Sequence, residues 1–148
     1  MQKSKFEIKP YEAEDALKVA ELKEFFEEMW GEQALLSEIN NTASIAVVAK
    51  KEQQVIGFCA FSVVKEEANL NMILVHPQYR KKGIAGAMLS EILNKLKEQN
   101  VQEAYLEVRA LNEVAFNLYK KLGFEQVGLR KNFYKNPEDD ALIMHCYL

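Results

Sequence analysis

The sequence contains few of the residues that stabilise a protein by means other than a hydrophobic core. Its 148 residues include two cysteines, two histidines, three prolines and one tryptophan. Cys59 and Cys146 lie within apolar runs, and neither they nor His76 and His145 have metal-ligand spacing, so we expect buried free thiols and no metal site. Hydrophobic residues make up 49% of the chain. One core is the expectation at this length, so residues 1–148 are predicted to form a single domain.

Two further features are absent, a long apolar run and an excess of positive charge. The N-terminus "MQKSKFEIKP" is polar, and no uninterrupted apolar run approaches the ~18 residues needed to cross a bilayer. The formal net charge is -3, which argues against a general nucleic-acid binder. We therefore expect a cytoplasmic protein, a monomer or a homodimer, without direct contacts to nucleic acid or membrane.

The first half of the chain changes from strand to helix and back to strands. "KFEIKP" alternates and predicts a short strand that ends at Pro10. From about residue 12 to 40, apolar residues recur at helical spacing with a break near Gly31, which predicts two helices. Three β-rich runs follow, "SIAVVAK", "QVIGFCAFSVV" and "ANLNMILV", and predict a meander of three strands.

The second half alternates helices and strands. The apolar spacing after Gly83 predicts a helix of about four turns, and "EAYLEVRA" predicts a strand. Asn112 is a candidate N-cap for the helix "EVAFNLYKKL", which Gly123 should end in a left-handed conformation. "FEQVGLR" and "DALIMHCYL" predict two more strands. This order indicates an α/β protein whose mixed sheet has helices on both faces.

A cluster of positive charges precedes the helix that follows Gly83. Arg80, Lys81 and Lys82 stand where the helix dipole is positive, an unfavourable placement unless an anion lies among them. Backbone N–H groups at this helix start, together with Gly83 and Gly86, could hold a phosphate or pyrophosphate. The residues alone leave a solvated basic turn as an equal alternative.

Longer segments around this loop resemble a known family. "RKKGIA" is similar to the Arg-x-x-Gly-x-Gly/Ala signature of the GNAT superfamily of acetyl-CoA-dependent N-acetyltransferases. With "ILVHPQYRKKGIAGAML", "YLEVRALNEVAFNLYKKLGF" and "RKNFYKNPEDDALIM", residues 70–144 resemble the RimI-type branch, which acetylates the N-terminal alanine of a small-subunit ribosomal protein. The resemblance implies a GNAT fold, with a central mixed, mostly antiparallel sheet of six to seven strands flanked by about four helices. It also implies acetyl-CoA as cosubstrate and direct attack by a primary amine.

The resemblance further implies where acetyl-CoA binds. The backbone of Ile73, Leu74 and Val75 would bind the acetyl group and the pantetheine arm. Asn112 matches a family residue that contacts the cofactor, a role compatible with its N-cap role. Ala85 stands where the closest relatives often have glycine. The loop that would hold the pyrophosphate comprises Arg80, Lys81, Lys82, Gly83, Ile84, Ala85 and Gly86.

Direct transfer to an amine needs a base for the ammonium and an acid for the departing thiolate. Glu107 shares a strand face with Tyr105 and Arg109, and the residues alone leave open whether it is a base or the partner of Arg109. Tyr119 lies on an amphipathic helical stripe, where a core role is the common one. The family match "LEVR" implies that Glu107 is the base, and "LYKKLGF" implies that Tyr119 is the acid.

The acceptor is less defined by the sequence. Residues 1–38 carry ten acidic residues against five lysines, either a surface for cationic partners or an ordinary solvated face. Of the family's Pro-Trp-Ser element only Trp30 is present, whereas "RKNFY" keeps the family pattern and implies that Tyr134 contacts a peptide. The first expectation is therefore acetylation of a peptide or protein N-terminus, possibly of a ribosomal protein. A small amine such as a polyamine is the alternative acceptor, and a non-catalytic acetyl-CoA-binding module is a third, less favoured reading.

Overall fold

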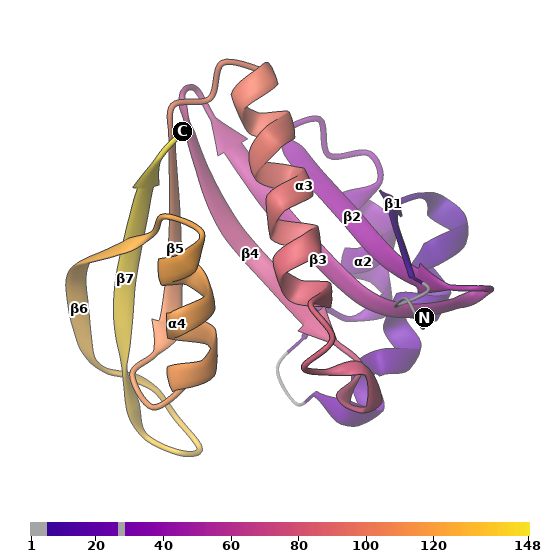
Figure 1. Ribbon diagram of the computed structural model, residues 1–148. Helices are drawn as coiled ribbons and strands as arrows, with labels where there is room; N and C mark the ends of the chain where they lie inside the picture. Colours follow the sequence, from indigo (N-terminus) through magenta and orange to yellow (C-terminus); the bar gives the residue numbers. More distant parts are fainter. Residues whose placement is uncertain (1–5, 27–28) are drawn as a thin grey trace, which may run out of the picture.

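A seven-stranded sheet forms the centre of the structure, a computed structural model that describes residues 6–26 and 29–148 (Figure 1). The strands run β1-β2-β3-β4-β5-β7-β6 across the sheet, and only β4 and β5 are parallel neighbours. This is the mixed, mostly antiparallel sheet that the sequence predicted. The strands are β1 (Glu7–Pro10), β2 (Ser44–Lys51), β3 (Gln54–Val64), β4 (Glu67–Val75), β5 (Glu103–Arg109), β6 (Glu125–Tyr134) and β7 (Asp139–Tyr147).

Helices cover the two halves of the sheet unequally. In Figure 1, α3 (Ile84–Glu98) and α4 (Glu113–Lys121) lie on the near face, α3 across β2 to β4 and α4 over β5 and β7. The helices α1 (Ala16–Ala20) and α2 (Glu32–Glu38) lie behind the β1–β4 half. Among the described residues, no helix covers the far face of β5, β7 and β6. Within the described part of the chain, no helix is long and apolar enough to cross a membrane.

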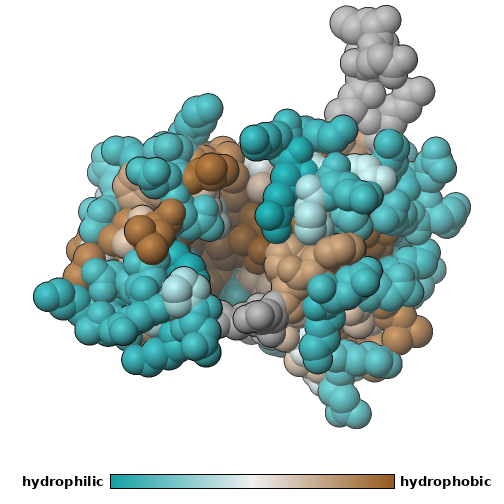
Figure 2. Space-filling model, turned by 90° about the horizontal axis from the view of Figure 1, so that it is seen from below, coloured by the Kyte–Doolittle hydropathy of each residue, from teal (hydrophilic) through white to brown (hydrophobic). Residues whose placement is uncertain are grey.

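The parallel pair β4–β5 separates after a short contact. Its register covers three residue pairs, from Glu67 opposite Glu103 to Asn69 opposite Tyr105. The register of β3 against β4 shifts at Leu70–Met72, and a bulge of this kind bends a strand away from its neighbour. Beyond it, β4 and β5 diverge toward the lower edge of Figure 1. Figure 2 looks from below into this opening and shows a hollow between the two halves with apolar atoms inside.

The central strand β3 explains why both faces of the β1–β4 half need cover. Seven consecutive residues of β3, 55–61, are buried. Cys59 and Phe61 pack in the core under α3, whereas Phe58 and Ala60 pack under α1 and α2. A Cβ atom on Gly57 would lie 3.0 Å from the Met88 side chain, so this glycine lets α3 approach the sheet.

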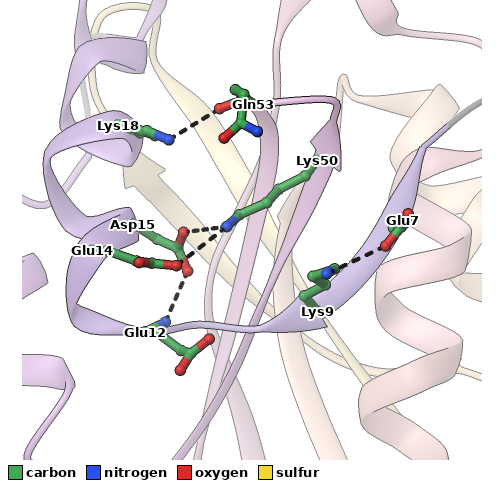
Figure 3. Close-up of polar contacts among 8 residues, drawn as sticks. All are labelled: Glu7, Lys9, Glu12, Glu14, Asp15, Lys18, Lys50 and Gln53. Atoms are coloured by element: carbon green, nitrogen blue, oxygen red, sulfur yellow. Dashed lines mark hydrogen bonds and ion pairs between the residues drawn. The ribbon is translucent and has the colours of Figure 1, made fainter.

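An ion pair is buried under the N-terminal helices (Figure 3). The Nζ atom of Lys50 lies 2.7 Å from Oδ1 of Asp15, whose side chain is 1% exposed. The other oxygen of Asp15 accepts a hydrogen bond of 2.9 Å from the backbone N–H of Glu12. The hydrogen bond with Asp15 raises the pKa of Lys50 above its ordinary value. At least this member of the acidic N-terminal segment is therefore structural.

The predicted elements match the structure closely, with differences in two places. The two helices predicted between residues 12 and 40 exist, but α1 has five residues and is flanked by 3₁₀ turns, Ala13–Asp15 and Glu21–Phe25. Ala16 and Val19 of α1 are buried against β2 and β3, and Leu22 of the second 3₁₀ turn is also buried. The last hairpin is also longer than predicted, because β6 continues through "RKNFY" to Tyr134.

Candidate active site

The opening between β4 and β5 leaves one side of β4 without a strand partner. From Leu70 to Val75, β4 pairs with β3 but with no other strand of the described chain. Backbone N–H and C=O groups alternate between the two sides of a strand, so part of this stretch faces the opening with unpaired groups. Ile73, Leu74 and Val75 lie here. Such an edge can bind the amide groups of an extended ligand as an added strand would.

The loop after β4 has the backbone of an anion site. Gly83 adopts φ 81° and ψ 10° directly before α3, and Lys81 has φ 62°. No atom lies within 4 Å of the place where a Cβ of Gly83 would be. The first N–H groups of a helix have no partner within it, and the open space at Gly83 lets a phosphate approach them.

The charged side chains of this loop are available to such a ligand. Arg80, Lys81 and Lys82 are all exposed. The Arg80 guanidinium lies 5.7 Å from the ring centre of Phe26, within the range of a cation–π contact. Ile84 is buried at the start of α3, whereas Ala85 and Gly86 are partly exposed. The loop therefore joins positive charge to free backbone donors.

The start of α4 lies beside the same region. Asn112 caps α4 as predicted, since its side chain accepts a 3.2 Å hydrogen bond from the Ala115 N–H. Gly123 has φ 102° and follows the end of α4, again as predicted. A Cβ atom on Gly86 would lie 3.5 Å from Leu118, so α3 and α4 come close together there. The Asn112 contact with a cofactor is a prediction that this geometry leaves untested.

Glu107 lies on the open face of β5. Its neighbours Leu106 and Val108 point into the core under α3 and α4, so the alternation predicted for this strand is confirmed. The Glu107 side chain is 35% exposed and its Oε2 lies 3.1 Å from Nε of Arg130 on β6. The structure thus gives Glu107 an ion pair with Arg130 of β6.

Sequence reasoning did not select Arg130. It lies within "RKNFY", the segment quoted for Tyr134, but its proximity to Glu107 depends on the pairing of β5, β7 and β6. Strand register across three strands cannot be deduced from one sequence without knowing the turns and bulges. The only available signal was a positive charge in a segment already expected to line the site.

Tyr119 lies on the other face of the sheet, on α4. It is 5% exposed and belongs to the main core, with its ring 6.1 Å from that of Phe124. Burial raises the pKa of Tyr119 strongly above 10, and nearby Cys59 and Tyr134 raise it further. The phenol therefore stays protonated at neutral pH. The core position, which the sequence offered as an alternative, is compatible with a role as proton donor.

Tyr134 and Arg109 form a stacked pair at the end of the β6–β7 hairpin. The Arg109 guanidinium lies 4.3 Å from the Tyr134 ring centre and donates hydrogen bonds to the carbonyl oxygens of Pro137 and Lys135, at 2.9 and 3.2 Å. Tyr134 is also the smallest of the three causes that raise the pKa of Tyr119, after burial and Cys59. Trp30 lies farther into the N-terminal half, 6.0 Å from Phe58.

The elements of the structure thus bring most predicted residues to one opening. The unpaired stretch of β4 forms one side and β5 with Glu107 forms the other. The basic loop lies at the end of β4, and Tyr119 approaches from α4. Cys59 and Cys146 are buried free thiols as predicted, and burial raises the pKa of Cys146 to about 11. Neither thiol has the low pKa of a nucleophile.

Comparison with known proteins agrees with this geometry. The chain is 40% identical over 101 residues to the ribosomal protein bS18-alanine N-acetyltransferase of Haemophilus influenzae. The matched segment covers 66% of this chain and 68% of that protein. It is 30% identical over 144 residues to a putative enzyme of the same name from Bacillus subtilis, covering 96% of this chain and 95% of that one.

Solved structures and a family model agree with these relatives. The crystal structure of the ribosomal-protein-S18-alanine N-acetyltransferase from Escherichia coli superposes with a TM-score of 0.88 at 28% identity, covering 96% of this chain and 93% of that one. Residues 15–124 match the model of the acetyltransferase (GNAT) family. The unpaired β4 edge, the left-handed Gly83 and the basic loop fit the amides and phosphates of acetyl-CoA. The chain belongs to the GNAT family and is an acetyl-CoA-dependent N-acetyltransferase.

Proposed function

We propose that this enzyme acetylates the α-amino group of a protein N-terminus, with alanine as first residue and a ribosomal protein as its substrate. The observation that carries the proposal is the arrangement around the β4–β5 opening. Glu107 lies on its open face beside Arg130, and Tyr119 lies on its α4 side with a raised pKa. The named activities of the relatives at 30–40% identity support the same acceptor.

In the proposed reaction Glu107 is the base. The incoming ammonium gives a proton to the carboxylate, and the free amine attacks the thioester carbonyl of acetyl-CoA as the C–S bond breaks. An α-ammonium has an ordinary pKa near 7.7 to 8.0, against about 10.4 for lysine. At neutral pH an α-ammonium therefore gives up its proton to a surface carboxylate more readily than a lysine or a polyamine does.

Tyr119 supplies the second proton. The departing thiolate takes the phenolic proton, which the raised pKa keeps on Tyr119 at neutral pH until the transfer. The second proton that the nitrogen loses as the amide forms restores the phenol through solvent. We expect Tyr119→Phe to lower kcat roughly 10²-fold, within the range for a lost general acid, because the ring still fills its core site. Tyr105→Phe, which removes a hydroxyl from the partly exposed face of β5, is the matched control.

Acetyl-CoA would be held by the β4 edge and the loop. The backbone of Ile73, Leu74 and Val75 would bind the pantetheine amides. The pyrophosphate would lie on the segment Arg80 to Gly86, with Asn112 at its side. Trp30 and Tyr134 would contact the acceptor peptide. We place this reaction in the cytoplasm, carried out by residues 1–148 as one domain.

A panel of acceptors tests the assignment. Peptides that begin with alanine, peptides with other first residues, and spermidine are compared by thiol release from acetyl-CoA. We expect alanine peptides to have the highest kcat/KM and Tyr134→Ala to raise their KM while leaving the KM for acetyl-CoA unchanged. The control is Tyr147→Ala, at a tyrosine that is 82% exposed near the end of β7.

The panel also separates the competing functions. If spermidine exceeds every peptide and Tyr134→Ala has no effect, the enzyme is a small-amine acetyltransferase and the peptide assignment is wrong. If acetyl-CoA binds but no amine is acetylated, the chain is a binding module.

A further inference from the structure

The Glu107 carboxylate is held by an arginine that reaches it from two strands away. Arg130 is on β6, the edge strand, and β7 separates β6 from β5. Its Nε lies 3.1 Å from Oε2 of Glu107. The guanidinium also lies 5.4 Å from the ring centre of Phe133 on its own strand. The Arg130 guanidinium thus contacts both an aromatic ring and the carboxylate.

The sheet register shows how one side chain spans β7. Ala141 of β7 lies opposite Arg130 on one side and Arg109 on the other, and Ile143 lies likewise between Gly128 and Glu107. Strands two apart are separated by about 10 Å, close to the combined reach of an arginine and a glutamate. Ala141 carries only a methyl group and Gly128 has no side chain. The contact from Arg130 to Glu107 therefore runs diagonally between Ala141 and Ile143, and the Ile143 side chain leans toward Gly128, where a Cβ would lie 3.3 Å from its Cδ1.

The Arg130–Glu107 ion pair is expected to contribute little to the stability of the fold. The side chains of Arg130 and Glu107 are 58% and 35% exposed, and solvent-exposed ion pairs contribute little to folding. The contact instead orients the Glu107 carboxylate. One carboxylate oxygen is engaged by Arg130, which restricts the rotamers of Glu107 and leaves the second oxygen for a proton.

We propose that Arg130 is a positioning residue that orients the Glu107 carboxylate at the β4–β5 opening. This inference rests on the proposed role of Glu107 as base. Arg130 takes no part in a bond-making step. Its loss leaves Glu107 free to rotate over the open face, and displacement of a catalytic group by about 1 Å can cost up to 10²-fold in rate.

The test is a double-mutant cycle with steady-state kinetics. Wild type, Arg130→Gln, Arg130→Lys, Glu107→Gln and the double variant Arg130→Gln/Glu107→Gln are assayed with the best acceptor of the panel. We expect Arg130→Gln to lower kcat roughly tenfold or more with an unchanged KM for acetyl-CoA, and Arg130→Lys to recover part of the loss. In the Glu107→Gln background, Arg130→Gln should have no further effect. Lys131→Gln, which removes a charge from the neighbouring position of β6, should match wild type.

Three outcomes overturn the proposal. One is an equal loss from Arg130→Gln in both backgrounds, and another is a rise in the acceptor KM at unchanged kcat, which makes Arg130 a substrate contact. The third is an unchanged Glu107 side chain in a crystal structure of Arg130→Gln, a result that needs no turnover.

The same cycle keeps the two proposals apart. If spermidine is the best acceptor, the peptide assignment fails while the cycle measured with spermidine still decides the role of Arg130. If Glu107→Gln alone keeps its full rate, Glu107 is not the base and the role of Arg130 falls with it.

Discussion

The two halves of the sheet each pair a carboxylate with a cation, and they do so in opposite surroundings. In the β1–β4 half, Asp15 is 1% exposed and lies 2.7 Å from Lys50 beneath α1. In the β5–β7 half, Glu107 is 35% exposed and lies 3.1 Å from Arg130 on a face without a helix. Helices cover both faces of the first half but only one face of the second (Figure 1).

This difference in burial distinguishes a carboxylate with a structural role, Asp15, from one proposed to transfer a proton, Glu107. A buried carboxylate must keep its partner, because an unpaired charge in the interior is strongly unfavourable. A carboxylate on an open face is hydrated by solvent, so separation from its partner costs little free energy. Such a carboxylate can therefore exchange its partner for a substrate. The folded framework is therefore concentrated in the β1–β4 half, and the proton-transfer group lies in the half that has an uncovered face.

The largest expected effect is on catalysis in the open half. Glu107→Gln should lower kcat by about 10² to 10⁴, the range for loss of a general base, with unchanged melting temperature and acetyl-CoA affinity. Steady-state kinetics and thermal denaturation measure the two quantities. Glu103→Gln, on the same strand four residues away, is the control and should keep its kcat. A normal rate in Glu107→Gln would remove the contrast between the two carboxylates.

The next effect is on stability in the covered half. Asp15→Ala removes the 2.7 Å partner of Lys50, leaves it the more distant Glu14 at 4.0 Å, and removes an acceptor from the Glu12 N–H, so the free energy of unfolding should fall by about 3 kcal/mol. Urea denaturation measures the loss. Glu7→Ala breaks an exposed pair with Lys9, also drawn in Figure 3, and should cost about 0.5 kcal/mol or less. Equal losses in the two variants would contradict the structural assignment of Asp15.

Ligand binding to the covered half should give the third effect. Acetyl-CoA at about 100 times its Kd should stabilise the wild type by roughly 2.7 kcal/mol, several degrees in melting temperature. Gly83→Val fills the open space at the loop and strains a φ of 81°, so this shift should disappear. Gly31→Val is the control, since Gly31 has φ -74° and no neighbour within 4 Å of its Cβ position. A full shift in Gly83→Val would place the cofactor elsewhere.

The smallest effect concerns the phenol between the two halves. Because burial raises the pKa of Tyr119, the folded state keeps a proton that the unfolded state loses above pH 10, so stability should fall as the pH rises beyond that value. One such group contributes at most about 1.4 kcal/mol per pH unit. Melting temperatures between pH 9 and 11 should therefore decline less steeply in Tyr119→Phe than in the wild type. Tyr147→Phe, at the exposed end of β7, should follow the wild type, and identical slopes in all three proteins would show that Tyr119 does not titrate as proposed.

Local sequence patterns anticipated most elements for simple reasons. The strand "QVIGFCAFSVV" is β3 residue for residue, since a continuous apolar run between polar turns suits a strand buried on both faces. Asn112 and Gly123 marked the ends of α4, because capping and a left-handed backbone are properties of single residues. The 3₁₀ turns around α1 were missed, because apolar residues three apart suit an α-helix as well as a 3₁₀ helix.

The candidate site was anticipated in part. The loop at Gly83, Glu107 and Tyr119 were found from local motifs and a family resemblance. Arg130 was not, although its Nε lies 3.1 Å from Oε2 of the proposed base. A partner two strands away in the sheet has no fixed spacing in the sequence, and two register shifts in the β6–β7 pair remove even the regular alternation.

The sequence by itself determined the order of strands and helices, the left-handed entry to α3, the inward and outward faces of β5, and the family to which the chain belongs. These follow from hydrophobic period, from backbone preferences and from contiguous motifs, all of which act over a few residues. Only the tertiary structure decided that β4 and β5 separate after three residue pairs, that Asp15 is buried on Lys50, and that Arg130 reaches Glu107 across β7. Each of these depends on where bulges and packing bring distant segments together, and that is a property of the whole fold.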